Sequence, residues 1–353
     1  MKEIFCKVAI LTNKHGDNHS GLWTSVWIDF CQSKELDFKV FPAHSLNIID
    51  DIRGYDVLLW HFSGYNFQDM LMARSILYSA KAMGLKVFPD FEDAWHFDDK
   101  LAENYMLQAI KAPIPKFYHF YTMDKLVEWL DNNPQFPIIA KLKNGSGSHN
   151  VRLINNRREA IKYGRRMLKK GFNGSPSLIF KASSNIRSAK SISTFINRAK
   201  RIPEFIRTLR GAREFPNERG YVLFQEFVPN DGYDLKIVVI GDKLSYIVRS
   251  IRKGDFRASG GGDLFFDKNY VTKNIIDTAF ATSDALNFKC MGYDYVVNNK
   301  TGEAKIVEIS YGFSHTALLQ AGGYFDRNGN WHDDPLNAPK ELLKNLLDTS
   351  KNA

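Results

Sequence analysis

Two stretches of the sequence carry residues whose types and spacing suit phosphate and metal chemistry. Residues 137–151 combine two lysines with a turn rich in glycine and serine. Lysine ammonium groups, and backbone N–H groups in glycine-rich turns, bind anions such as phosphate. In the second stretch, 292–310, Asp294 and Glu308 lie within otherwise apolar segments that a turn separates. Together the two stretches predict a site for a nucleoside triphosphate and its metal.

The first stretch predicts a strand that leads into a phosphate-binding turn. Lys141 and Lys143 are two residues apart on this strand, so we expect both side chains on one face. Beyond them lies the predicted turn, made of Gly145, Ser146, Gly147 and Ser148. It is not a Walker loop, because no Gly-Lys-Ser/Thr opens a helix here. A plain hairpin between two strands is the alternative interpretation.

The second stretch predicts a metal site at Asp294 and Glu308. Mg²⁺ prefers oxygen ligands and often joins one or two carboxylates to nucleotide phosphates. An unpaired carboxylate within an apolar strand is costly, so each of these residues needs a partner. A salt bridge to Arg249 or Lys305 is the alternative to a metal ion.

Further residues could bind the rest of a nucleotide and a substrate. Residues 221–229 predict a buried strand whose polar end presents backbone groups to an adenine, with Glu226 accepting from the adenine amino group. Alternatively, Gln225 and Glu226 are ordinary polar residues at a strand edge. The hairpin 234–249 continues into a segment rich in arginine and glycine, where arginines could clamp phosphoryl oxygens. The loops after Leu11 and Trp60 of a predicted parallel sheet, and this glycine run, supply the predicted substrate-binding residues His61, Ser259 and Gly260.

The elements that position these residues predict a mixed α/β protein. Strands and helices alternate over the first ninety residues, which predicts a parallel sheet with helices on its faces. From residue 137 onward, turn sequences between apolar strands predict antiparallel pairing. The predicted units are a parallel α/β domain over 1–97, a lid over 98–185, a basic amphipathic insertion over 186–218 and a C-terminal unit with the metal site over 219–353.

The positive charge of the chain is concentrated in one region. The net charge is +9, but residues 152–213 contain 17 Lys and Arg against two Glu, or +15, so the remainder carries −6. This region predicts an anionic partner, and a solvated basic surface is the alternative. The three cysteines lack metal-ligand spacing, which indicates a reduced, cytoplasmic protein.

In order and spacing, these motifs resemble the ATP-grasp superfamily, particularly the glutathione-synthetase and RimK-type carboxylate–amine ligases. The resemblance implies that Lys100 and Lys141 contact ATP phosphates and that Asp234 lies near the ribose. It implies an adenine-binding segment made of Gln225, Glu226, Phe227 and Val228. Arg249 and Arg257 match residues that stabilise the acyl-phosphate step, and Asp294 and Glu308 match metal ligands. Ser310 stands where the family usually has an Asn ligand, so the resemblance implies Ser310 as a third metal ligand. Because a hydroxyl is a poorer ligand than an amide oxygen, the number of bound Mg²⁺ ions, one or two, stays open.

Segments 59–62, 95–100 and 308–313 resemble a subgroup found among bacterial surface-polysaccharide genes. This resemblance implies an ATP- and Mg²⁺-dependent ligase that joins an amino acid or small amine to a uronic-acid carboxylate of a glycan. The alternatives are a ligase directed at peptides or proteins, or an ATP-binding module with weakened catalysis that binds a membrane or another anionic partner.

The same interpretation extends to partners and location. We expect a cytoplasmic protein, compatible with a homodimer, whose residues 190–210 could rest on an anionic membrane surface at the inner membrane face. Nucleic acid is not expected, because the basic residues there alternate with core-type apolar residues instead of exposed aromatics.

Overall fold

The computed structural model describes residues 6–13, 23–64, 66–132, 135–145, 150–174, 215–251 and 263–348. The predicted fold class is confirmed: the chain is mixed α/β, with one parallel sheet and several antiparallel ones. Some predicted residues lie outside the described ranges, namely Ser146, Gly147, Ser148, Arg257, Ser259, Gly260 and the segment 190–210.

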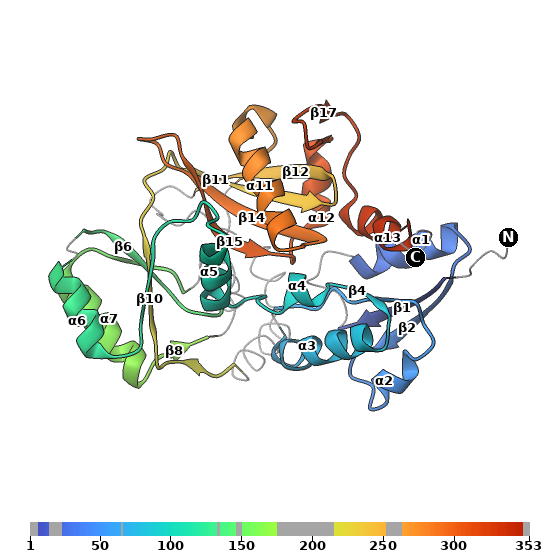
Figure 1. Cartoon of the computed structure of the whole chain (residues 1–353), viewed down its shortest axis with the longest axis horizontal. Helices are drawn as coiled ribbons and strands as arrows, with labels where there is room; N and C mark the ends of the chain where they lie inside the picture. Colours follow the sequence, from blue (N-terminus) through green and yellow to red (C-terminus); the bar gives the residue numbers. More distant parts are fainter. Residues whose placement is uncertain are drawn as a thin grey trace, which may run out of the picture.

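The N-terminal part forms a four-stranded parallel sheet, here called the parallel sheet (Figure 1). Its strands, in spatial order, are β2 (Asp37–Pro42), β1 (Lys7–Thr12), β3 (Val57–Leu59) and β4 (Lys86–Phe88). Residues 8–11 of β1 are fully buried, as their continuous apolar run predicts. Its helices are α1 (Trp23–Ser33), α2 (Ile48–Asp51) and α3 (Phe67–Ala82).

A second, small sheet is antiparallel and lies at the other end of the molecule (Figure 1). Its strands, in spatial order, are β5 (Phe117–Phe120), β10 (Val222–Glu226), β6 (Ile138–Lys141) and β7 (Arg152–Ile154). Helices α6 (Met123–Asn132) and α7 (Arg157–Lys169) cover one face. The two helices approach closely at Gly164, where a Cβ would lie 2.3 Å from the Leu126 side chain. A short ribbon, β8 (Phe172–Asn173) with β9 (Asn217–Glu218), follows α7.

The third layer is a seven-stranded sheet, here called the large sheet. Its main strands are β11 (Tyr233–Ile240), β12 (Lys243–Ser250), β14 (Cys290–Val297) and β15 (Ala304–Ser310), and the predicted hairpin turn at Gly241–Asp242 joins the first two. The edge strands are β13 (Leu264–Phe265), β16 (Tyr324–Phe325) and β17 (Trp331–His332). The accompanying helices are α11 (Lys273–Ala285), α12 (His315–Leu318) and α13 (Ala338–Asp348), with 3₁₀ turns η1 (Lys268–Tyr270) and η2 (Leu319–Ala321).

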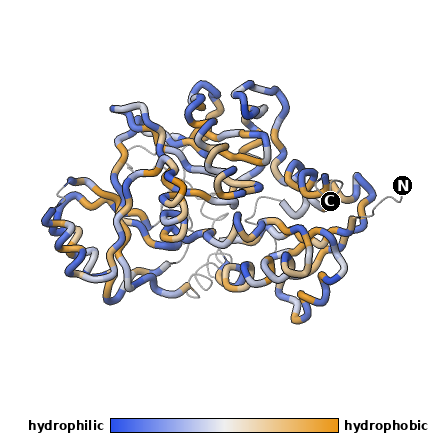
Figure 2. Tube along the Cα trace, viewed as in Figure 1, coloured by the Kyte–Doolittle hydropathy of each residue, from blue (hydrophilic) through white to orange (hydrophobic). Residues whose placement is uncertain are grey.

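Two hydrophobic cores hold these layers. One core joins the parallel sheet to the large sheet, and the other lies between the small sheet and helices α6 and α7. Figure 2 shows hydrophobic residues along the central strands and hydrophilic residues along the outer helices. Between the sheets lie α4 (Phe91–Ala94) and α5 (Lys100–Ala109). Asp93 of α4 accepts hydrogen bonds from the backbone N–H groups of Lys289 and Cys290, which ties the parallel sheet to β14.

The predicted domain boundaries stay predictions. Because β10 belongs to the small sheet, the chain returns to the lid at 222–226 before it enters the large sheet. This pairing favours a last boundary after Glu226 instead of at residue 219. Within the described ranges, no helix is long and apolar enough to cross a membrane.

Candidate active site

The N-terminus of α5 brings Lys100 between the small and large sheets. Asp99 caps this helix by accepting a hydrogen bond from Ala102 N. The Lys100 ammonium is buried, 2.9 Å from the carbonyl oxygen of Gly145 and 3.1 Å from Glu308 Oε1. Burial opposes its charge, but Glu308 and Asp98 raise the pKa of Lys100 above its usual range. The structure therefore joins three predicted site residues, from the lid turn, α5 and β15.

Lys141 ends β6 on the face of the small sheet that looks toward the large sheet. Its ammonium donates a hydrogen bond to the carbonyl of Val307 on β15, at 3.0 Å. Burial lowers the pKa of Lys141 to about 8, although Glu308 acts in the opposite direction. Lys141 makes no direct ion pair with a described residue. A bound anion would therefore stabilise its buried charge strongly.

The expectation that Lys143 shares a strand face with Lys141 is wrong. Strand β6 ends at Lys141, so the alternation of side chains stops before Lys143. The Lys143 ammonium instead pairs with Asp99, at 3.2 Å from Oδ2, while its backbone N–H donates to the Tyr221 hydroxyl at 2.5 Å. Lys143 remains beside the start of the turn, and its side chain is anchored at the N-cap of α5.

Asp294 and Glu308 lie opposite each other on β14 and β15, so their side chains share a face of the large sheet. Asp294 contacts two cations: Lys236 Nζ at 2.5 Å from Oδ1 and Arg249 Nη2 at 3.1 Å from Oδ2. Burial opposes its ionisation, but Arg249 and Lys236 together lower the pKa of Asp294 to about 2. Asp294 thus faces two cations, and Glu308 faces Lys100. Carboxylate oxygens are also the ligands that Mg²⁺ prefers when it is bound together with nucleotide phosphates.

Arg249 makes the salt bridge to Asp294 that was the alternative to a metal ion, and it lies at the predicted site. It donates to both carboxylate oxygens of buried Asp234 as well as contacting Asp294. Burial opposes its charge, yet Asp294 and Asp234 raise the pKa of Arg249, so it stays a cation. The predicted salt bridge to Arg249 therefore exists, whereas Lys305 pairs with Glu303. Asp234 serves to hold the arginine at the site.

Ser310 is placed less favourably for a metal than its neighbours. Its hydroxyl accepts a hydrogen bond from Gly312 N at 3.0 Å and donates to Gly312 O at 3.3 Å. It therefore closes the turn that follows β15. Among described residues, no group of three or more His, Cys, Asp or Glu could hold a metal ion. Any divalent ion here would depend on phosphate oxygens besides Asp294 and Glu308.

Two residues at the site were not predicted. Lys236 lies in β11, in register with Asp294, and no local sequence signal identifies this nonlocal pairing. Glu103 lies one turn after Lys100 and accepts a hydrogen bond from Ile309 N at 3.3 Å through Oε2. Its Oε1 has no hydrogen-bond partner in the described part of the chain. Burial raises the pKa of Glu103 to about 8, although Lys100 acts to lower it.

The predicted adenine segment lies at the end of β10, but its two polar side chains differ in their surroundings. Glu226 accepts a hydrogen bond from Lys116 N at 3.2 Å, so its carboxylate already fastens β10 to the residue before β5. Gln225 is buried in register with Ile139 of β6, and its amide nitrogen has no partner among described residues. Phe227 and Val228 follow the strand, and the Val228 carbonyl accepts from Asn230. Gln225 is therefore the better candidate for a side-chain contact with a base.

His61 follows β3 and is buried among aromatic rings. Its ring stacks on Trp23 at 4.5 Å between centroids, and Tyr311 lies edge-on at 5.6 Å. Burial lowers the pKa of His61 to about 3, so the imidazole is neutral. The Tyr311 hydroxyl donates to the Phe62 carbonyl at 2.9 Å. This hydrogen bond holds the loop after β3 against the residues that follow Ser310. His61 therefore lies near the C-terminal end of β15.

Solved structures of several ligases are similar to this chain. D-alanine–D-alanine ligase from Bacillus anthracis gives a TM-score of 0.59 at 11% sequence identity, over 98% of both chains. The ATP-grasp ligase PsnB, complexed with a minimal precursor, gives 0.55 at 11% identity, over 98% of this chain and 99% of its own. D-cycloserine synthetase DcsG gives 0.55 at 11%, over 96% of this chain and 99% of its own.

No protein-family model and no curated protein matches the sequence. At such low identities, structural likeness shows the fold alone. The likeness covers nearly the whole chain. The chain thus has the fold of the ATP-grasp ligases.

Proposed function

We propose that this protein is an ATP- and Mg²⁺-dependent ligase that joins a carboxylate to an amine through an acyl phosphate. The observation that carries the proposal is the meeting of Lys100, the lid carbonyl of Gly145 and Glu308 within 3.1 Å. Lysines of the small sheet and α5 face carboxylates of the large sheet. The phosphates of ATP would pair with the lysines, and a bound metal ion would pair with the carboxylates. The D-alanine–D-alanine ligase of the same fold was solved with ATP.

In the proposed reaction, an oxygen of the substrate carboxylate attacks the γ-phosphorus of ATP. The bond from that phosphorus to the bridging oxygen breaks, and ADP leaves. The amine nitrogen then attacks the acyl carbon, phosphate leaves and the nitrogen loses a proton, which gives the amide. Lys100, Lys141 and Arg249 stabilise the charge that spreads over the phosphoryl oxygens, because they are held in place before the reaction begins. Asp294 and Glu308 would hold Mg²⁺, which would neutralise phosphate charge there.

For the substrates we propose a uronic-acid carboxylate of a bacterial surface glycan and an amino acid or small amine. This choice rests on the sequence resemblance described above. A ligase directed at peptides is the second candidate, favoured by the structural likeness to PsnB, which was solved with a precursor peptide. A cytoplasmic location, a homodimer and contact with an anionic membrane are proposed only from the sequence.

The test is ADP release with Mg-ATP across a panel of uronic acids, amino acids and acidic peptides, each paired with amines. Glu308→Ala removes a carboxylate of the site, and Glu303→Ala is the matched control because Glu303 is exposed on the preceding turn. We expect ADP only with a particular acid–amine pair, lost in Glu308→Ala and kept in Glu303→Ala. Equal ADP release by wild type and Glu308→Ala would refute the assigned site. ATP binding without turnover for any pair would refute the ligase.

A further inference from the structure

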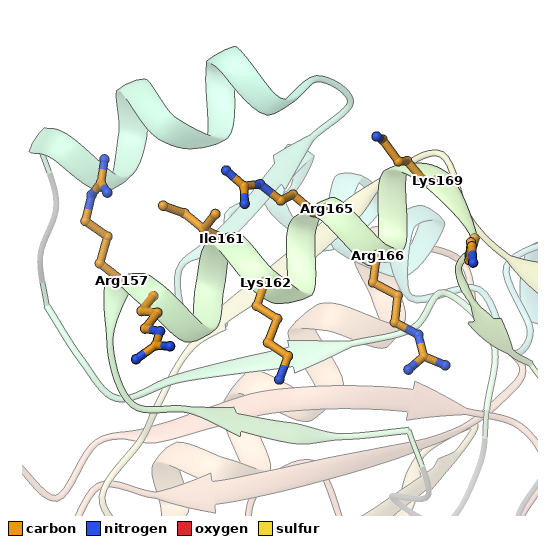
Figure 3. Close-up of a pocket in the computed structure, with 8 residues that line it drawn as sticks. Arg157, Ile161, Lys162, Arg165, Arg166 and Lys169 are labelled. Atoms are coloured by element: carbon orange, nitrogen blue, oxygen red, sulfur yellow. The ribbon is translucent and has the colours of Figure 1, made fainter.

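The outer face of α7 is an unusually basic surface, and the proposed site does not use it. Residues Ala160, Tyr163, Gly164 and Met167 of this helix are buried against the small sheet. The opposite face borders an open hollow of about 870 Å³, lined by Arg157, Arg158, Ile161, Lys162, Arg165, Arg166, Lys169 and Lys170. Figure 3 shows Arg165 and Lys169 on one side of the helix and Lys162 and Arg166 on the other.

Most of these cations have no counter-charge among the residues that the structure describes. Arg157 pairs with Asp131 at 2.6 Å, and Arg166 donates to the Gly171 carbonyl while it lies over the Phe172 ring. The remaining cations make no ion pair with an acid in the described ranges; they are Arg158, Lys162, Arg165, Lys169 and Lys170. Glu159, the one acid of the helix, accepts from Asn155 N at its start.

The charges form two lines along the helix. One line contains residues 157, 165 and 169, and the other contains 158, 162, 166 and 170, with repeats of four residues, or about 6 Å along the axis. The helix is therefore about 20 Å long and carries positive charge from end to end. Regular repeats of charge along a groove suit a polymer with a charge on each unit better than a single small anion.

Three other occupants fit poorly. The neighbouring segment 175–214 contains nine Lys and Arg against two Glu, so it carries like charge and would be repelled. A helix that lies on a membrane inserts an apolar face, but the apolar face of α7 is used in the core. Among the described residues that line the hollow, Ile161 is the only apolar one, and none carries an aromatic ring on which nucleic-acid bases could stack.

We propose that the outer face of α7 docks a glycan with repeating carboxylates, so that the proposed ligase binds a polymeric acceptor more tightly than a small acid with the same reacting carboxylate. This inference rests on the proposed function, because a polyuronate both supplies the reacting carboxylate and carries charge on every sugar. The surface lies on the side of the small sheet that Tyr163 and Phe224 define, whereas Lys141 points from the other side to β15. Docking there therefore leaves the nucleotide site open.

The experiment measures binding of fluorescent oligogalacturonate to the full chain, without ATP, at low and high salt. The variant is Lys162→Glu/Arg165→Glu/Lys169→Glu. The control with the same charge change is Lys34→Glu/Lys111→Glu/Lys300→Glu, at exposed positions in other elements. We expect affinity to fall at least about tenfold in the α7 variant, or roughly 1.4 kcal/mol, and about twofold or less in the control.

Competing arms use polyglutamate, single-stranded RNA of matched charge and vesicles of phosphatidylglycerol. Tighter binding of any of these, or an equal loss in both variants, would overturn the proposal. ADP release with a small acid–amine pair should be unchanged in the α7 variant, which shows that it folds. Binding is measured without ATP, so it tests docking even if the ligase assay shows no ADP release. The ligase assay likewise tests the proposed function even if docking is lost.

Discussion

Replacing Lys141 by methionine should make the protein more stable at neutral pH while it weakens ATP binding. The pKa of the buried ammonium lies near 8 instead of 10.5, and this difference corresponds to about 3 kcal/mol against the charged form. Methionine removes this cost but also removes the hydrogen bond to the Val307 carbonyl, worth about 1–3 kcal/mol when the acceptor stays buried. We expect a net gain in the free energy of unfolding of about 1 kcal/mol at pH 7.

The pH dependence gives a sharper test than the net value. Below pH 8 the folded protein holds the ammonium at a cost, whereas the unfolded chain keeps its proton up to about 10.5. Between these values the folded state binds fewer protons, so the stability of the wild type rises with pH relative to the variant. The advantage of Lys141→Met should therefore fall by about 3 kcal/mol from pH 7 to pH 10.5 and reverse in sign.

Urea unfolding of both proteins across this pH range measures the difference directly. Lys300→Met removes an ammonium from an exposed turn and corrects for the loss of one charge from a basic protein. A stability difference between wild type and Lys141→Met that stays constant from pH 7 to pH 10.5 would refute the assignment of a costly buried charge. Unchanged ATP affinity in the variant would remove Lys141 from the nucleotide site.

Two further predictions concern the carboxylates. Asp294→Asn leaves Lys236 and Arg249 with less negative charge in a buried place, so the free energy of unfolding should fall by about 3 kcal/mol; an unchanged urea midpoint would contradict this. The raised pKa of Glu103 means that the folded state holds its proton longer than the unfolded chain. Wild-type stability should thus fall relative to Glu103→Gln as the pH rises from 4.5 to about 8, and parallel melting curves over that range would count against it.

The sequence predicted strands from their apolar runs, and it predicted site residues where a charged side chain interrupts such a run. The apolar run at 8–11 forms β1, and the turn at Gly241–Asp242 joins β11 to β12 as expected. Asp294 and Glu308 stand out because each interrupts an apolar strand, and the turn between those strands implies that they pair. The structure places them directly opposite each other.

Other features depend on nonlocal pairing, which one sequence cannot supply. Lys236 reaches Asp294 only because β11 pairs with β14 in a particular register. The strand that carries Lys141 ends two residues before Lys143, and the backbone N–H of Lys143 donates to the Tyr221 hydroxyl instead of continuing the strand. Glu226 looks free for a ligand in the sequence, but it fastens β10 to Lys116. These contacts are made by residues far apart in the chain, so periodicity gives no sign of them.

The ribbon of β8 and β9 has a consequence for how this protein can change over evolution. Gly171 at its start has a positive φ and lies so close to β9 that a Cβ would come within 2.0 Å of the Glu218 carbonyl oxygen. Gly174 N donates to Pro216 O, so the chain ends at 174 and 215 are held side by side. Both ends are thus fixed whatever stands between them. A side chain at Gly171 would therefore be selected against, because it would collide with β9 and displace the ribbon that holds both ends.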